Sequence, residues 1–141
     1  MGSPSGPIKP LARRPRQALR RFGAARLGGR ITDISSAIQS SVRSHQRHYG
    51  IVRDYTGHGI GSAMHMEPDV PNFGRAGKGP TITEGMAVAV EPMVTMGREA
   101  TATLDDEWTV VTRDGSWASH WENTMTVTRG GLWVLTEHDG G

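Results

Sequence analysis

Residues 52–74 form the most informative stretch of the chain, and they read VRDYTGHGIGSAMHMEPDVPNFG. Residues 51–55 have the character of a strand, and they lead into a glycine-rich turn at residues 57–61 that contains His58. The glycines allow the backbone to approach another group closely. The turn lacks the G-x-G-x-x-G spacing of a phosphate loop, so we do not expect it to bind phosphate. Within this turn His58 is a candidate metal ligand, although a histidine in such a turn also has many structural uses.

Two glutamates stand at the ends of strand-like segments. Glu91 follows the apolar run 86–90 in EGMAVAVEPMV, and Glu122 precedes the strand pattern 124–128 in WTVVTRDGSWASHWENTMTVT. A carboxylate at the end of a buried strand is costly unless it is paired or binds a metal. An imidazole with carboxylates suits Zn, Mn, Fe or Co, and two glutamates can bridge two ions that share a water. Each glutamate alone also fits a solvated or salt-bridged role, so the spacing leaves both interpretations open.

Helical and strand patterns divide the chain into two parts. Ile34, Ile38 and Val42 recur every four residues, which predicts a helix with Thr32 as its N-cap and an end by Gly50. Another helix is predicted over residues 15–26. Strands are predicted at residues 86–90, 108–112, 124–128 and 132–135, with hairpin turns at 114–115 and 130–131. This order predicts an α+β fold, in which helices precede an antiparallel sheet.

The composition limits the kinds of protein that this chain can be. Its 141 residues are enough for one domain, and the absence of cysteine excludes disulfides and thiolate metal ligands. The 19 glycines and 8 prolines indicate a turn-rich domain. No apolar run approaches membrane-spanning length, so we expect no membrane partner. A reducing cytoplasm is the expected location.

The N-terminal region differs from the rest in charge. Residues 1–30 contain no acidic residue, whereas all 14 acidic residues follow them. Residues 1–14 are rich in Pro, Gly, Ser and Arg, and we expect them to form a disordered basic arm. An organelle transit peptide is a weaker alternative. Only Phe22 offers an aromatic ring to stack on bases, so no specific nucleic-acid partner is expected.

Taken together, the three quoted stretches resemble type I methionine aminopeptidases over about residues 17–136. The resemblance implies a pita-bread fold, in which two related halves surround a dinuclear metal site. Residues 15–141 would be the C-terminal half, a partial catalytic domain with an antiparallel sheet and helices on one face. The implied activity is removal of the initiator methionine from new proteins, so the partners would be peptide or nascent-protein N-termini, with the ribosome as a further candidate.

The resemblance also assigns roles to individual residues. His58, Glu91 and Glu122 match metal ligands, with Glu122 bridging two divalent ions (Co, Mn, Fe or Zn) and Glu91 serving also as general base. Three residues match positions that contact the substrate: His65, Met64 and Trp108. The first of them would hydrogen-bond the substrate and stabilise the tetrahedral intermediate, and the other two would line the methionine pocket.

The chain departs from the family pattern at several positions. Met66 stands where a glutamate is usual, Asn123 where a histidine is usual, and Glu107 where a turn glycine is common. The two aspartate ligands and a further histidine of the family belong to the N-terminal half. Asp33 and Asp54 do not match them. A non-catalytic binding protein derived from this fold, or a gene fragment, is therefore the alternative function. A dipeptidase or proline-specific peptidase of the same fold is less favoured.

Two further expectations follow from a half-fold. Too few ligands remain for two metal ions, so we expect the chain alone to be a poor aminopeptidase. We also expect the strands at 86–90 and 124–127 to expose apolar surface, because one face of the core would lack its partner.

Overall fold

A computed structural model of the protein describes residues 23–137. Within them lie one helix and ten strands: α3 (Ile31–Arg43), β1 (Gly50–Ile51), β2 (Gly57–Ile60), β3 (Met66–Val70), β4 (Ala87–Val90), β5 (Met93–Thr95), β6 (Thr101–Thr103), β7 (Val110–Thr112), β8 (Ala118–His120), β9 (Asn123–Thr128) and β10 (Gly131–Val134). The predicted arm at 1–14 and residues 15–22 of the predicted first helix lie outside the described residues. Residues 23–26, the end of that predicted helix, are not helical, so the prediction is wrong there.

Helix α3 begins two residues earlier than its sequence pattern predicts. Arg30 is the N-cap, and its backbone N–H donates to the Asp33 carboxylate over 2.8 Å. The predicted N-cap, Thr32, lies inside the helix, where its hydroxyl donates to the Lys78 carbonyl and accepts from the Lys78 N–H. The predicted spacing is confirmed, because Ile34 and Ile38 are fully buried. The helix therefore presents one apolar stripe to the sheet and is tied at its start to the loop before β4.

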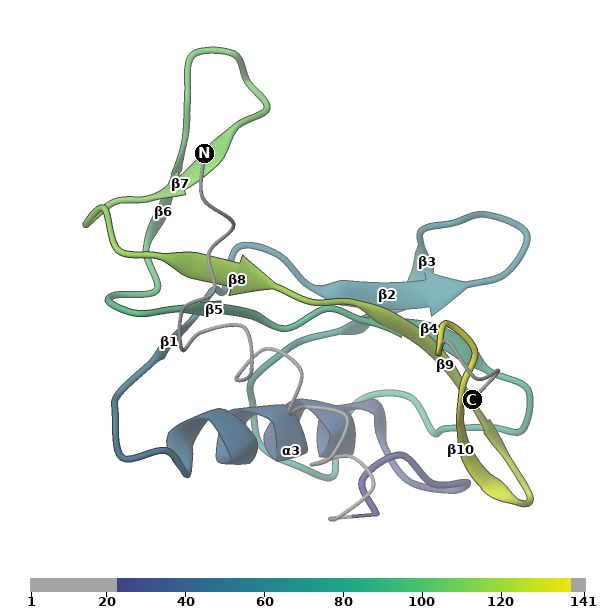
Figure 1. The fold of residues 1–141 in the computed structure, drawn as a ribbon. Coiled ribbons are helices and arrows are strands. Elements are labelled where there is room, and N and C mark those ends of the chain that lie inside the picture. Colours follow the sequence, from purple (N-terminus) through teal and green to yellow (C-terminus); the bar gives the residue numbers. More distant parts are fainter. Residues whose placement is uncertain (1–22, 138–141) are drawn as a thin grey trace.

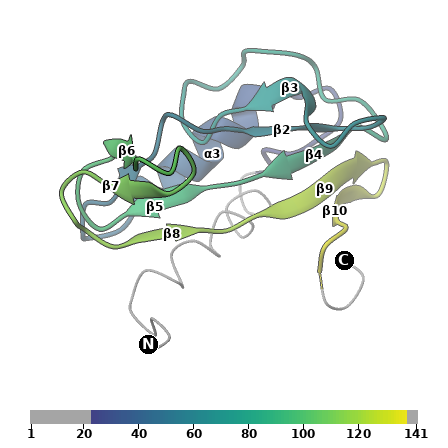
Figure 2. The same cartoon turned by 90° about the horizontal axis from the view of Figure 1, so that it is seen from above.

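Two antiparallel sheets are joined because two chain segments pass from one sheet into the other. The larger sheet has the order β10-β9-β4-β2-β3 and the smaller has the order β1-β5-β8. Strands β4 and β5 follow each other closely, as do β8 and β9, and the two segments run side by side through both sheets (Figures 1 and 2). Hairpin β6–β7 projects from one end, on the side away from α3 (Figure 1). The expected antiparallel sheet with helix on one face is confirmed.

Some predicted strands and turns are placed differently by the fold. Strand β1 (Gly50–Ile51) overlaps the strand predicted at 51–55 only at Ile51, and most of the predicted glycine-rich turn is itself strand β2. Its glycines leave room for the carbonyls of neighbouring strands, so they serve close strand packing rather than a bend. The turn at 130–131 does join a hairpin, β9–β10. The turn at 114–115 does not, because β7 pairs with β6 and β8 pairs with β5.

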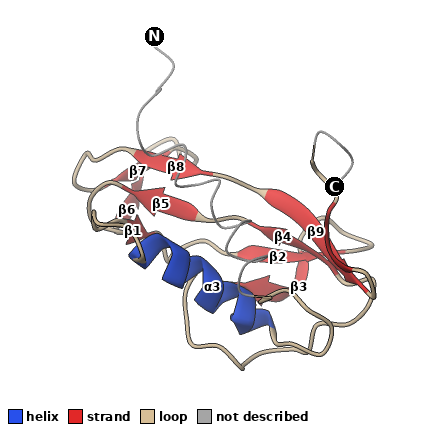
Figure 3. Ribbon diagram, turned by 60° about the horizontal axis from the view of Figure 1, so that its bottom comes forward, coloured by secondary structure: helices blue, strands red, loops and turns tan. Residues whose placement is uncertain are grey.

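The main core lies between α3 and the larger sheet. Figure 3 shows from the helix side how α3 lies over one face of the strands. Val88, Val90, Met125 and Val127 are buried in this core against the isoleucines of α3. The expectation that strands 86–90 and 124–127 expose apolar surface is therefore wrong, because the helix covers them. The exposed large apolar side chains lie elsewhere: Leu27, Tyr55, Met64, Met66, Leu104, Trp108, Val110, Val111, Trp117, Trp133 and Leu135. Within residues 23–137, no helix has the length and apolar character that a membrane span needs.

Candidate metal centre

The register of three strands brings the predicted ligands to one face of the larger sheet. His58 on β2 lies opposite Ala89 on β4, and Glu91 follows two residues later. Side chains alternate along a strand, so Glu91 shares the face of Ala89 and His58. Strand β9 pairs with β4 as far as Asn123, which places its neighbour Glu122 beside Glu91. The opposite face of β4 packs on α3, so the helix supports the strand that carries Glu91.

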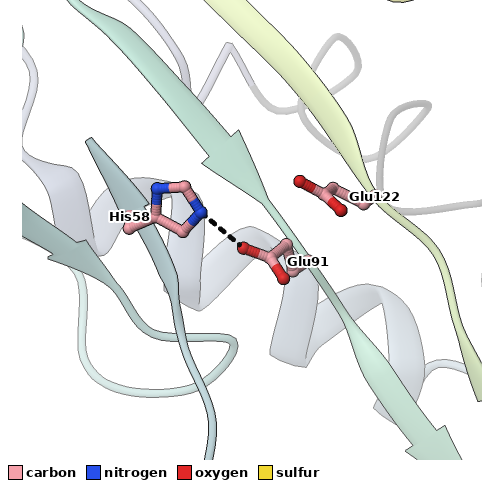
Figure 4. Close-up of side chains that lie close together, drawn as sticks. All are labelled: His58, Glu91 and Glu122. Atoms are coloured by element: carbon pink, nitrogen blue, oxygen red, sulfur yellow. Dashed lines mark ion pairs between the residues drawn. The ribbon is translucent and has the colours of Figure 1, made fainter. Parts of the chain in front are cut away.

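The three side chains converge closely enough to share a cation. Ligand atoms of His58, Glu91 and Glu122 all lie within 4.8 Å of one another (Figure 4). Nδ1 of His58 lies 2.9 Å from the Gly59 carbonyl, which can only accept, so Nδ1 carries the proton and Nε2 of the neutral ring has a free lone pair. That Nε2 faces Oε1 of Glu91 at 3.2 Å. The expected convergence of the three residues is thus met, while their roles as ligands remain predictions.

One buried atom tests whether this arrangement fits a metal ion. Oε1 of Glu91 is buried and accepts no hydrogen bond, although a buried carboxylate oxygen normally does. Two ligand atoms that each lie roughly 2.1 Å from a tetrahedral ion are about 3.4 Å apart, close to the separation of Nε2 and Oε1. A cation between His58 and Glu91 would satisfy both atoms at once. The residues present therefore fit a divalent metal.

The electrostatics of Glu91 point in the same direction. Burial raises the pKa of the Glu91 carboxyl, and the negative charge of Glu122 raises it further. The imidazoles of His58, His120 and His65 lower this pKa in part. Two neighbouring carboxylates of which one is largely buried are costly without positive charge between them. A bound cation would supply that charge and hold both groups ionised.

A pocket of about 760 Å³ opens above the convergent side chains. Its lining is mostly apolar and consists of Val52, Tyr55, Thr56, His58, His65, Glu91, Met93, Thr101, Trp108, Val110, Val111, Thr112, Ala118, Ser119 and His120. Trp108 contributes one wall, yet 87% of its surface is exposed. The pocket thus joins a polar floor to an apolar wall on hairpin β6–β7.

The residues predicted to contact substrate are placed unequally. The ring of His65 lies 4.3 Å from that of His58, centroid to centroid, so it borders the metal centre. Met64 is 71% exposed and does not line the pocket in this structure. Trp108 does line it. The substrate roles of all three remain predictions.

The three residues that depart from the family pattern are not members of the convergent cluster. The Asn123 amide donates to the Thr136 hydroxyl, and the Met66 sulfur packs beside Gly61 in the loop before β3. Glu107 has φ of 57°, the left-handed region that suits the glycine it replaces. Asp54 accepts a hydrogen bond from Thr101, so this aspartate is engaged outside the cluster, as expected.

One residue at the site was missed by sequence reasoning. Nε2 of His120 lies 3.4 Å from Oε2 of Glu91, on the side away from His58. The available signal was alternation, because His120 precedes Glu122 by two residues in a strand-like stretch and so shares its face. The pairing of β8 with β5 was needed to show which residue it contacts.

Known proteins with similar sequences are methionine aminopeptidases. A methionine aminopeptidase of Clostridium acetobutylicum is 52% identical over 110 residues, 78% of this chain and 43% of the relative. Methionine aminopeptidase 1 of Mycobacterium tuberculosis is 44% identical over 96% of this chain and 53% of its own length. The chain thus spans about half the length of the curated relatives that it matches.

Solved structures and the family model give the same assignment. The crystal structure of methionine aminopeptidase from Thermotoga maritima superposes with a TM-score of 0.82 at 38% identity, over 92% of this chain and 52% of that chain. The expected C-terminal half of the pita-bread fold is confirmed by this likeness. The match to the model of metallopeptidase family M24 covers residues 3–129, beginning earlier than the resemblance from about residue 17 had indicated. Such a family implies a divalent metal, and among residues 23–137 His58, Glu91 and Glu122 form a group that could hold one. This chain belongs to metallopeptidase family M24.

Proposed function

We propose that this site serves the metal-dependent removal of methionine from the N-termini of peptides and newly made proteins. The observation that carries the proposal is the convergence of His58, Glu91 and Glu122 within 4.8 Å at the floor of an apolar pocket. The names of the relatives, methionine aminopeptidases at 44–52% identity, support the choice of substrate.

Each residue then has a role that its position allows. Divalent ions (Co, Mn, Fe or Zn, two when the site is complete) would supply an activated water and polarise the scissile carbonyl. His58, Glu91 and Glu122 would hold the metal, and the Glu91 carboxylate would accept the proton. Its side chain is only 14% exposed, and burial raises the pKa of its carboxyl. His65, whose ring lies beside that of His58, would hydrogen-bond the substrate.

The pocket wall suits an unbranched apolar side chain. Trp108, Val110 and Val111 line it from hairpin β6–β7, and Met93 lines it from β5. A thioether packs well against an indole ring. The substrate methionine would therefore lie along this wall with its carbonyl towards the polar floor.

The isolated chain is proposed to turn over poorly. Within residues 23–137, the convergent cluster offers one imidazole and two carboxylates, which are too few to hold two ions at a fixed separation without many waters. The runner-up function is a non-catalytic binding protein that uses the same pocket. The exposure of Trp108 favours it, because an open aromatic wall can bind a peptide without cleaving it.

Two assays measure metal binding, peptide binding and peptide cleavage separately. In the first, titration calorimetry should show that Mn(II) binds to the wild-type chain and does not bind to His58→Ala. Absence of metal binding to the wild type would overturn the proposal.

Cleavage is then followed on a Met-Ala-Ser peptide with Co(II), Mn(II) or Fe(II) supplied. Slow release of methionine that is abolished by Glu91→Ala supports the enzyme. Binding of the peptide with no release above that of Glu91→Ala supports the binding protein instead. His48→Ala removes an exposed imidazole that is not among the residues lining the pocket, and it serves as the control in both assays.

A further inference from the structure

The two oxygens of Glu91 face two different histidines. Oε1 lies 3.2 Å from Nε2 of His58, and Oε2 lies 3.4 Å from Nε2 of His120. The second contact was not anticipated from the motifs. It brings a third element, β8, to a carboxylate that otherwise depends on β2 and β9.

The position of His120 follows from strand register. Strand β8 pairs with β5 so that His120 lies opposite Met93, two residues after Glu91. The backbone N–H of Trp121 donates to the Pro92 carbonyl, which holds the two segments together at the junction of the sheets. His120 and Glu122 therefore flank Glu91 from one segment, two residues apart and on the same face.

His120 is not a member of the metal cluster itself. The atoms that could share one ion belong to His58, Glu91 and Glu122, and those of His120 are not among the set that lies mutually within 4.8 Å. The contact is thus with the oxygen of Glu91 that points away from His58. A group in such a place acts on the ligand and not on the ion.

We propose that His120 is a positioning residue for the metal centre: its Nε2–H holds Oε2 of Glu91, so that Oε1 stays directed at the ion shared with His58. This inference rests on the proposed function, since it assumes a metal at that site. The repulsion between Glu91 and Glu122 would otherwise turn the Glu91 carboxylate away from its neighbour. Groups that orient a metal-binding side chain typically contribute 10- to 100-fold in metal affinity, by order of magnitude.

The expected effect lies at the lower end of that range. The His120 side chain is 50% exposed, so water can replace part of the contact. We expect His120→Leu, which keeps bulk but has no donor, to weaken Mn(II) or Zn(II) binding about tenfold. His120→Gln keeps an N–H donor and should restore affinity to within about threefold of wild type.

The experiment measures Mn(II) and Zn(II) affinity by titration calorimetry, and the melting temperature without metal, for the wild type, His120→Leu, His120→Gln and His48→Ala. We expect only His120→Leu to bind metal weakly, and we expect all four proteins to melt at the same temperature in the absence of metal. Equal affinity of the Leu and Gln variants would overturn the proposal, as would a loss of metal affinity matched by an equal loss of apo stability.

Metal binding by the wild type and by His58→Ala shows whether the proposed function or only the role of His120 fails. If the wild type binds no metal, the proposed function fails and His120 has no centre to position. If the wild type binds and His58→Ala does not, but His120→Leu binds normally, only the role of His120 is refuted.

Discussion

A substitution at Gly59 tests the dependence of the site on close strand packing. Gly59 lies in β2 between β3 and β4, opposite Met66 on one side and Val88 on the other. A Cβ at this position would overlap the carbonyl oxygen of Glu67, and it would lie 2.7 Å from the Glu67 carbonyl carbon and 3.0 Å from the Met66 oxygen. These are backbone atoms, so no rotamer change relieves the contact. The backbones of strands β2 and β3 must therefore shift apart in a Gly59→Ala variant.

The size of the effect follows from what moves. Overpacking that displaces backbone costs about 1–3 kcal/mol, and the upper end applies because three backbone atoms are involved. The Gly59 carbonyl also accepts the hydrogen bond that orients His58. Its displacement tilts the imidazole away from Glu91, and about 1.4 kcal/mol of lost binding energy is a tenfold loss of metal affinity. We expect both effects in one variant.

Gly61→Ala is the matched control from the same motif. A Cβ there meets the sulfur of Met66 at 3.1 Å and its terminal methyl at 3.6 Å, and this flexible side chain can turn aside. The control should change stability by less than about 1 kcal/mol. Urea melts and Zn(II) titration of both variants measure the difference. Equal melting and equal zinc affinity of the two variants would refute the argument from strand packing.

Four other predictions concern separate features. Ile38→Ala removes a fully buried side chain between α3 and the sheet, and it should lower the free energy of unfolding by about 2–5 kcal/mol in urea melts. Glu107→Gly should raise that free energy by about 1 kcal/mol, because glycine relieves the left-handed strain at φ 57°. The backbone N–H of Arg98 donates to the Asp114 carboxylate and lowers its pKa from 3.8 to about 2. This carboxylate therefore adds stability that is fully present above pH 3.8 and is lost as the pH falls through about 2. Asp114→Asn should make the melting temperature depend less on pH in that window. Trp108→Ala should leave the melt unchanged, because the indole is exposed, but should weaken binding of a Met-Ala-Ser peptide in calorimetry.

Much of the architecture could be predicted from local pattern. The four-residue spacing of Ile34 and Ile38 indicates a helix whatever its neighbours, because only one helical face can be apolar and buried. The apolar run before Glu91 indicates a buried strand for a similar reason. The motifs around His58 and Glu122 indicated the remaining ligands through their resemblance to a family. These features depend on residues close together in the chain.

Local pattern failed where a distant partner decided the outcome. Thr32 resembles an N-cap, but its hydroxyl is occupied by Lys78, and the helix starts at Arg30 instead. The turn at 114–115 resembles a hairpin turn, but the strands on either side pair with different neighbours. The apolar strands expected to be exposed are covered by α3. In each case the deciding contact lies outside the short motif on which the prediction was based.

The sequence by itself supplied the prediction that His58, Glu91 and Glu122 bind a metal, because an imidazole and carboxylates suit such an ion and the motifs around them resemble those of a family. The tertiary structure alone decided how they are held. Antiparallel register places His58 and Glu122 on either side of Glu91, and the pairing of β8 with β5 adds His120 at its other oxygen. The physical reason is that a one-residue shift in register would turn every one of these side chains to the opposite face, and register is set by the burial of whole strands against α3.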